Sequence, residues 1–227
     1  MLRFYSFILS LLILFSSTAF AAKPSISSTA ASEWANSKGR ELLFTLSEKD
    51  IEKKYQKLDK MFIDYVNLDY ISKFVIGKYA KLMTDEQQVV YKDLFYRYVL
   101  SLYKQLNLDF DASKVDFSID SIIEKPKHTD VVCSVNISKL INSPEQLPIP
   151  AKFKLIRGKD NNIQAVDVEI ASVSLVIEYR KRFYQMIKDE SENINWFLEK
   201  FSAMVEANEK NAFNKSDIQI QTFPQKI

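Results

Sequence analysis

The segment VDVEIASVSLVIEYRKRF, from Val166 to Phe183, contains two different periodicities. Its first half alternates between apolar residues, several of them β-branched, and polar residues, which is typical of a β-strand. Its second half has the spacing of a helix, and Tyr179 and Arg180 lie near the junction. The segment therefore predicts a strand that continues directly into a helix.

Three more alternating segments precede this strand. They are KVDFSIDSII (114–123), DVVCSVNIS (130–138) and IPAKFKLI (149–156), and the last strand is expected within 163–175. Because the connections are short and a parallel pair needs a long crossover, the four strands are predicted to form a twisted antiparallel sheet. Periodic apolar residues predict helices before the sheet, within 32–107, and after it, within 176–207. The predicted fold class is therefore α+β.

Two capping signals indicate where helices begin. Asp50 follows Ser47 by three residues, and Gln87 follows Thr84 by three residues, and both pairs have the spacing of a capping box. The helix after Thr84 is predicted to reach about Asn107, and its apolar stripe is wider than a surface helix needs.

The N-terminus has the pattern of a secretory signal peptide. Met1–Arg3 is basic, Phe4–Phe15 is almost wholly apolar, and the stretch ends in Ala-Phe-Ala at Ala21. A membrane anchor is the alternative, but this apolar core is shorter than the roughly 20 residues of a spanning helix. We therefore expect cleavage after Ala21, a single domain over 22–207 and a polar C-terminal tail over 208–227.

Composition argues against several classes of function. The 31 basic and 29 acidic residues nearly cancel and show no basic patch, which argues against nucleic-acid binding. A single cysteine, Cys133, excludes an internal disulfide, and with a single histidine, His128, a zinc site or a Cys–His nucleophile is not expected. The three glycines do not form a phosphate-binding loop. We expect no metal and no cofactor, and Cys133 is interpreted as a buried structural thiol.

An enzyme remains one alternative. Asp116 and Asp120 are a pair of carboxylates of the kind that glycosidases use, but they lie on the polar side of a predicted strand. A solvated strand face explains them equally well, so we expect no catalytic activity.

Two blocks of the sequence resemble a known family. Asp167, Val168, Ile170, Val173–Leu175, Tyr179–Arg180 and Phe183 resemble the last strand and following helix of the MlaC family, the periplasmic phospholipid-binding auxiliary proteins of an ABC transport system, also called toluene-tolerance proteins. FVIGKYAKLMTDEQQVVYKDLFYRYVLSLY (74–103) resembles a second block of that family. The resemblance extends over roughly 32–205. This chain departs from the family pattern at Ser172 and within Glu190–Asn193, where the family usually has glycine, and at Ile163–Gln164, where it usually has tryptophan.

The resemblance implies a fold and a function. The fold is expected to be similar to nuclear-transport-factor-like and cystatin-like domains, with an apolar cavity between sheet and helices. The expected cargo is a phospholipid, carried through the periplasm between an outer-membrane lipoprotein complex and an inner-membrane ABC transporter, which maintains outer-membrane lipid asymmetry. The alternative is a periplasmic protein-interaction module without bound lipid.

A lipid carrier needs a long apolar cavity, because an acyl chain of about sixteen carbons loses on the order of 12 kcal/mol on leaving a bilayer. For Arg180, phosphate binding at the cavity mouth competes with an ion pair to a carboxylate such as Asp167. Each apolar candidate is equally explained as ordinary core. The candidate lipid-binding residues are Val99, Tyr103, Leu106, Val135, Phe153, Val166, Val168, Val173, Tyr179 and Arg180.

Overall fold

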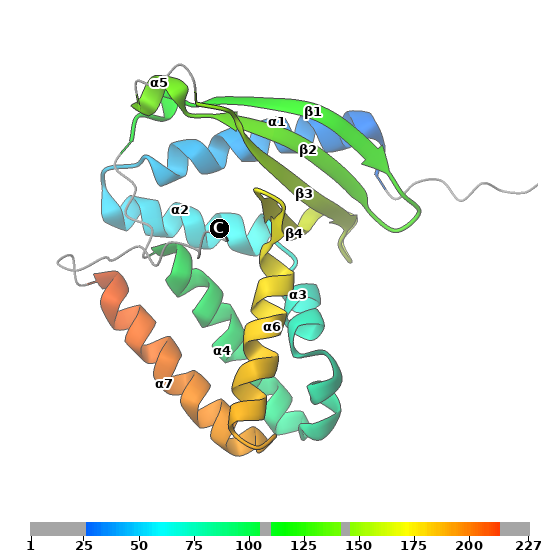
Figure 1. The fold of residues 1–227 in the computed structure, drawn as a ribbon, viewed down its shortest axis with the longest axis vertical. Coiled ribbons are helices and arrows are strands. Elements are labelled where there is room, and N and C mark those ends of the chain that lie inside the picture. The colour runs from blue at the N-terminus through cyan, green and yellow to red at the C-terminus, as the bar shows by residue number, and fades with distance from the viewer. Residues whose placement is uncertain (1–25, 105–109, 142–145, 214–227) are drawn as a thin grey trace, which may run out of the picture.

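A computed structural model of the chain describes residues 26–104, 110–141 and 146–213, and the expected signal peptide lies outside these ranges. Figure 1 shows an upper layer, formed by the sheet with one long helix against it, and a lower group of helices. The elements are α1 (Ser28–Leu46), α2 (Ile51–Tyr65), α3 (Leu68–Ile76), the 3-10 helix η1 (Gly77–Leu82), α4 (Asp85–Lys104), the 3-10 helix η2 (Ala112–Lys114), β1 (Asp116–Glu124), β2 (Thr129–Asn136), α5 (Ser138–Ile141), β3 (Ile149–Arg157), β4 (Ile163–Ile170), β5 (Val173–Ser174), α6 (Leu175–Asp189) and α7 (Ile194–Phe213).

The sheet confirms the predicted α+β class. Its five strands are antiparallel and lie in the order β1-β2-β3-β4-β5, so each strand pairs with the next along the chain. Cys133 pairs with Ala151 and Val131 pairs with Phe153, which places the apolar residues of neighbouring strands on one face. Irregularities in register after Ile119 and after Lys154 interrupt the ladder, and such bulges increase the twist of a sheet.

Helix α1 covers the apolar face of the sheet at β1 and β2. A β-carbon at Gly39 would lie 2.9 Å from the ring of Phe117, so α1 approaches β1 closely at this glycine. The indole Nε1 of Trp34 donates a hydrogen bond of 3.0 Å to the carbonyl of Ile163, which ties α1 to the start of β4. The buried residues between α1 and the sheet, here called the sheet cluster, are Ile26, Ala31, Ala35, Phe117, Val131, Cys133, Ala151, Leu155 and Ala165.

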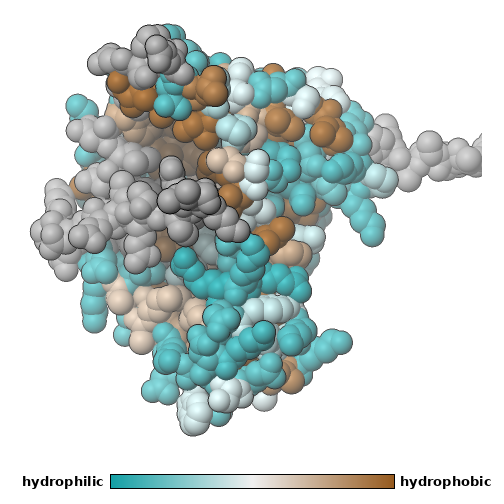
Figure 2. Space-filling view, viewed as in Figure 1, coloured by the Kyte–Doolittle hydropathy of each residue, from teal (hydrophilic) through white to brown (hydrophobic). Residues whose placement is uncertain are grey.

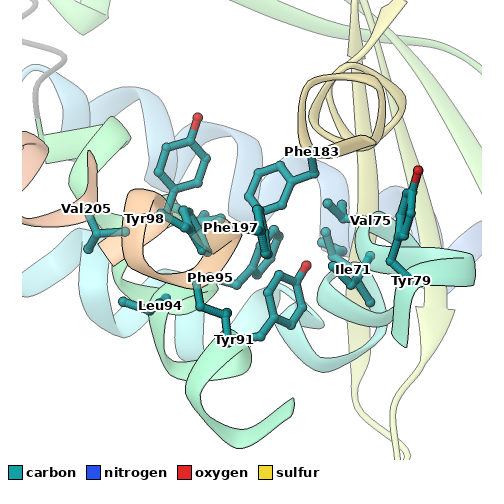
Figure 3. Close-up of a cluster of buried hydrophobic side chains, with 14 of the residues drawn as sticks. Ile71, Val75, Tyr79, Tyr91, Leu94, Phe95, Tyr98, Phe183, Phe197 and Val205 are labelled. Carbon is teal, nitrogen blue, oxygen red and sulfur yellow. The ribbon is translucent and has the colours of Figure 1, made fainter. Parts of the chain in front are cut away.

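A second core lies among the lower helices. Figure 3 shows its side chains gathered between α3, α4, α6 and α7. The rings of Phe183 and Phe201 meet edge to face with centroids 4.9 Å apart, an arrangement that aromatic pairs favour. This helical cluster consists of Phe62, Leu68, Ile71, Val75, Ile76, Tyr79, Met83, Tyr91, Leu94, Phe95, Tyr98, Val99, Val176, Phe183, Ile187, Ile194, Phe197, Leu198, Phe201 and Val205.

The junction between the last long strand and the helix differs from the prediction. The chain does not continue straight from strand to helix but reverses at Ala171 and Ser172, whose φ angles are 48° and 67°. Ile170 then pairs with Val173 in the short strand β5, and α6 begins directly afterwards. Two positive φ angles in a two-residue loop suit the right-handed twist of a hairpin. The alternating pattern continued through the turn, so sequence periodicity did not reveal the reversal.

The predicted helix ends are partly confirmed. Thr84 and Gln87 form the reciprocal pair of a capping box, with hydrogen bonds of 2.9 and 3.3 Å. The pair of Ser47 and Asp50 does not, because Asp50 itself is the N-cap of α2 and accepts from the backbone N–H of Lys53 at 3.1 Å.

The last helix extends further than predicted. Helix α7 continues past Ala207 to Phe213. Within this extension the carboxylate of Glu209 forms two hydrogen bonds with Arg97, of 2.9 and 2.7 Å. A two-point contact of this kind fixes both side chains and holds this part of α7 against α4.

Candidate functional site

The sheet cluster and the helical cluster are separate, and α2 crosses between the two layers (Figure 1). The layers are joined where α3 begins. There the backbone N–H of Asn67 donates to the carbonyl of Ala165 at 2.9 Å, and its side chain donates to Gln164 at 3.0 Å. Away from this junction, apolar side chains of each layer are left incompletely buried.

Half-buried apolar residues line both sides of the region between the layers. On the sheet side, Val135 and Phe153 pack against the sheet cluster, and Phe153 meets the ring of Trp34 at 6.1 Å. On the helix side, Tyr179 packs against the helical cluster with its ring 6.1 Å from that of Tyr98. On the face seen in Figure 2, brown apolar surface gathers at the end of the sheet next to α5 and recedes inward below it.

The apolar surface continues onto the junction of β4, β5 and α6. Ile170 pairs with Ala151 of the sheet cluster, so it lies on the apolar face of the sheet. Ile170 is 45 % exposed, and its strand partner Val173 is 41 % exposed. Ile177, in the first turn of α6, is 46 % exposed. Three neighbouring apolar side chains thus reach solvent at this end of the sheet.

The apolar candidates whose side chains the structure describes fall into three groups by burial. Val99 and Val166 are fully buried, with Val99 inside the helical cluster. Val135, Phe153, Val168 and Tyr179 are half-buried, and Val173 is exposed. Tyr103 lies in α4, but its side chain, like the whole of Leu106, lies outside the described residues. The half-buried group therefore contains the side chains best placed to contact a ligand between the layers.

Arg180 occupies a different environment from the one expected. Its Nη1 donates to the carbonyl of Phe74 at 3.1 Å, and its Nη2 donates to the hydroxyl of Tyr184 at 2.8 Å. The carbonyl of Phe74 is in the last turn of α3, where helix carbonyls lack partners within the helix, so Arg180 caps α3. The suggested ion pair with Asp167 was wrong. The Asp167 carboxylate accepts from the Ser174 hydroxyl at 2.7 Å and fixes the start of α6.

Gly77 and Tyr184 complete the surroundings of Arg180. Gly77 has a φ of 49°, and a β-carbon there would lie 2.9 Å from Nη2 of Arg180 and closer still to the Tyr184 hydroxyl. The guanidinium also stacks over the rings of Phe74 and Tyr184, 4.8 and 5.0 Å from their centroids. These contacts indicate a structural role for Arg180 in joining α6 to α3.

A comparison with models of protein families shows which family the chain belongs to. The model of the MlaC protein family matches residues 42–203, more than half of the 227 residues. The chain belongs to the MlaC family. The match confirms the resemblance that the blocks around Gly77 and Arg180 indicated.

Among solved structures, the MlaC-family chain is similar to a phospholipid-binding protein from Ralstonia solanacearum, solved in complex with a phospholipid. The two have a TM-score of 0.62 and 16 % sequence identity, and the alignment covers 80 % of this chain and 98 % of the other. At this identity the likeness establishes the fold. A comparison with curated proteins gave no match.

Two departures from the MlaC pattern fall on left-handed backbone. Ser172 lies in the turn before β5, and Ser191 and Glu192, with φ of 53° and 60°, lie between α6 and α7. This conformation favours glycine, because a β-carbon there costs about 1–2 kcal/mol. The turns at these positions therefore keep a glycine-like backbone although the residues differ.

The burial of Lys54 on α2 was not predicted from the sequence. Lys54, Leu58, Met61 and Phe62 have the spacing of one helix face, and all four are buried on α2. This spacing was a usable signal, but a lysine within it normally belongs to the solvated edge of a helix.

The other polar candidates have ordinary partners. Asp116 forms an ion pair of 2.8 Å with Lys139, and Asp120 accepts from the hydroxyl of Ser134 at 2.7 Å. Cys133 is buried, as predicted, and burial raises the pKa of its thiol from 9.0 to about 12. Over the described ranges there is no group of three or more potential metal ligands, and no helix is long and apolar enough to cross a membrane.

Two surface depressions lie away from these candidates, and Phe44 near the end of α1 lines both. The larger has a volume of about 480 Å³ and includes Lys49 and Lys114, and the smaller has a volume of about 180 Å³ and includes Arg40. Both are polar, shallow features beside η2, and neither includes an apolar candidate residue.

Proposed function

We propose that the protein binds a phospholipid between the sheet layer and the helical layer and carries it through the periplasm. The observation that supports this most directly is the separation of the two clusters, with half-buried apolar side chains on both sides of the region between them. Membership of the MlaC family and the phospholipid bound to the similar Ralstonia protein support the same ligand class.

The energetics of lipid transfer agree with this arrangement. Each buried methylene of an acyl chain is worth about 0.8 kcal/mol, so a carrier must offer a long apolar surface to match the bilayer. Val135, Phe153 and Val168 supply such a surface from the sheet, and Tyr179 supplies it from α6. Val173, together with Tyr103 and Leu106, extends the proposed lining, whereas Val99 and Val166 are buried in the core.

The proposed route follows from the family. The chain is exported by its signal peptide, with cleavage after Ala21, and exchanges lipid with an outer-membrane lipoprotein complex and an inner-membrane ABC transporter. Loss of the protein from its own bacterium should then raise the phospholipid content of the outer leaflet of the outer membrane. Unchanged lipid asymmetry in such a strain would contradict this route without bearing on lipid binding itself.

The decisive experiment for lipid binding is mass spectrometry of the bound cargo. The protein is expressed with its signal peptide, purified from periplasm without detergent and extracted with organic solvent. Near-stoichiometric phospholipid is the expected result, and a shortened N-terminus beginning at Ala22 is expected in the same sample. A folded protein without lipid would contradict the carrier function and favour a protein-interaction module.

One observation gives that second function some support. Leu82, Val89 and Trp196 are exposed apolar residues near the starts of α4 and α7, which Gln87 and Asn195 join by a hydrogen bond of 2.7 Å. Exposed apolar residues grouped in this way are typical of protein contacts. A carrier also has to dock on its donor and acceptor, so a contact surface here is compatible with lipid transport.

A further inference from the structure

Exposed apolar side chains gather at the end of the sheet next to α5. Ile170, Val173 and Ile177 reach solvent at the junction of β4, β5 and α6. Ile141 of α5 and Leu147, just before β3, add exposed fractions of 47 % and 78 %. These five residues are here called the end patch. Contiguous apolar surface of this kind is typical of a contact site.

The strand pairing brings the members of the end patch together. The backbone N–H of Ala171, in the turn between β4 and β5, donates to the carbonyl of Pro150 at 2.9 Å, three residues after Leu147. At the same end of the sheet Val135 pairs with Ile149, and α5 begins three residues after Val135. The brown surface beside α5 in Figure 2 lies over these elements. The end patch is therefore one surface rather than a set of scattered residues.

The last helix runs towards the side of the molecule that carries the end patch. Helices α4 and α7 lie side by side in the same direction, because Gln87 contacts Asn195 near their starts and Arg97 contacts Glu209 near their ends. In Figure 1 the end of α7 lies on the same side of the molecule as α5. The chain therefore leaves α7 at Phe213 with the end patch on the same side.

The sequence continues beyond Phe213 with residues 214–227, which lie outside the described ranges. They also lie beyond the match to the MlaC family, which ends at residue 203. Most of this segment is polar, but Ile218 and Ile220 alternate with Gln219 and Gln221. Such alternation places the two isoleucines on one side of an extended chain and the two glutamines on the other. The segment thus offers an apolar side that matches the chemistry of the end patch.

The segment is long enough to reach the end patch. The ring of Tyr98 is 5.6 Å from the ring of Phe201 and 6.1 Å from the ring of Tyr179, so one side chain separates α7 from α6 there. Phe213 lies about 18 Å further along α7, at a rise of about 1.5 Å per residue. The chain from Phe213 to Ile220 extends to about 23 Å. This length is sufficient to bring Ile220 to the start of α6, where the end patch begins.

We propose that the segment around Ile218 and Ile220 docks on the end patch of the lipid-free protein and is displaced when a lipid binds. Docking removes apolar surface of both partners from water, which is favourable in proportion to the area. The covalent connection to α7 raises the concentration of the segment at the patch to about the millimolar range, so a weak contact is sufficient. The displacement rests on the proposed lipid-carrier function, because acyl chains at this end of the sheet would cover the same side chains.

Disulfide trapping tests the docking, because the chain has a single cysteine, Cys133, that can be removed. In a Cys133→Ala background, Ile177→Cys is combined with Ile220→Cys, and the delipidated protein is oxidised at low concentration. The control pair is Ile123→Cys with Ile220→Cys. Ile123 and Ile177 are both 46 % exposed, but Ile123 lies near the hairpin of β1 and β2, at the opposite end of the sheet.

The Ile177 pair is expected to form an intramolecular disulfide at least about 10-fold faster than the control pair. Loading with phosphatidylglycerol from vesicles should slow the Ile177 pair at least about 10-fold. Equal rates for the two pairs would overturn the docking. A disulfide-linked dimer would mean that the segment of a second copy covers the patch, and would overturn the contact within one chain.

The role of lipid is decided by the same pair. Fast trapping that persists in lipid-loaded protein would overturn the displacement. Fast trapping in a protein that never binds lipid would overturn the carrier function and leave the docking standing. The failure of the proposed function is thereby distinguished from the failure of this contact.

A charge in the segment provides a second readout without added cysteines. Ile220→Asp should release the segment, because a carboxylate on an apolar surface must be desolvated. The delipidated variant should bind more of the apolar dye ANS and take up phosphatidylglycerol from vesicles about 3- to 10-fold faster than the wild type. Gln219→Asp adds the same charge on the polar side of the segment and should behave like the wild type. Equal dye binding and uptake in all three proteins would overturn the proposal.

Discussion

The guanidinium of Arg180 packs directly against the backbone of Gly77, where a β-carbon would lie 2.9 Å from Nη2. This contact joins α6 to the end of α3, because the same guanidinium donates to the carbonyl of Phe74. Both residues belong to the blocks that resemble the MlaC family. Their proximity gives those blocks a structural meaning, since the glycine makes room for the arginine.

Arg180→Ala should therefore lower stability and leave lipid loading unchanged. The variant loses two hydrogen bonds from a charged group, and we expect the free energy of unfolding to fall by about 2–3 kcal/mol. Lys181→Ala is the control, since Lys181 is exposed and, among the described residues, pairs with Glu178 one turn away, and it should change stability by less than about 0.5 kcal/mol. Denaturant unfolding and the lipid-to-protein ratio are the measurements. If Arg180→Ala kept full stability but bound less lipid, Arg180 would instead bind the lipid headgroup.

Ser172→Gly should stabilise the protein. The φ of Ser172 is 67°, and relief of its left-handed strain is only partly offset by the greater freedom of glycine in the unfolded chain. We expect a gain of about 0.5–1 kcal/mol in denaturant unfolding. Ser118→Gly, in the extended backbone of β1, should instead lose stability, because glycine weakens a strand. A loss in both variants would indicate that the Ser172 side chain makes a contact that outweighs the strain.

The turn at Ser172 was not predicted from the sequence, although most of the elements around it were. The four long strands followed from alternation, and the start of α4 followed from Thr84 and Gln87, because both signals are local. The reversal after Ile170 was missed because neither Ala171 nor Ser172 is a residue that normally marks a hairpin turn. Its position was set by tertiary contacts, including the hydrogen bond between Asp167 and Ser174.

The candidate site was harder to predict than the fold. Apolar residues with the same spacing line both a filled core and a ligand region. Nothing in the sequence therefore distinguished Val99 from Val135 as a candidate for lipid contact. Only burial separates them, since Val99 lies within the helical cluster and Val135 is half-buried. The burial of Lys54 was not predicted for a related reason, because it depends on how α2 packs against its neighbours.

The Cys133 thiol predicts a specific alkaline sensitivity. Burial raises its pKa from 9.0 to about 12, so the folded state disfavours the thiolate that the unfolded chain forms above pH 9. The contribution of Cys133 to stability is therefore complete below pH 9 and is lost as the pH rises towards 12. At pH 10 the loss is roughly 1 kcal/mol.

Cys133→Ala isolates this effect from other titrating groups. Unfolding of wild type and variant is compared at pH 8 and pH 10, and the variant should lose less stability over that interval. Iodoacetamide should label the native wild type at pH 8 far more slowly than the unfolded chain, because the buried thiol remains protonated. Rapid labelling of native protein, or equal pH dependence of the two proteins, would contradict the burial of this thiol.

The sheet wall of the proposed lipid site is tested by Val168→Glu. Val168 pairs with Phe153, so the two lie on the apolar face of the sheet, and Val168 is half-buried. A carboxylate there would require desolvation whenever an acyl chain is bound, and we expect lipid per folded protein to fall at least about 10-fold. Ile123→Glu is the matched control, because Ile123 is exposed and pairs with Asp130 on the opposite face. Phospholipid loading after export is measured by mass spectrometry on protein whose circular dichroism matches wild type.

Val168→Phe narrows the same region without a charge and should reduce loading as well. Normal loading in both Val168 variants would move the lipid away from this face of the sheet, whereas a loss in Ile123→Glu as well would point to a general effect of added charge on the fold.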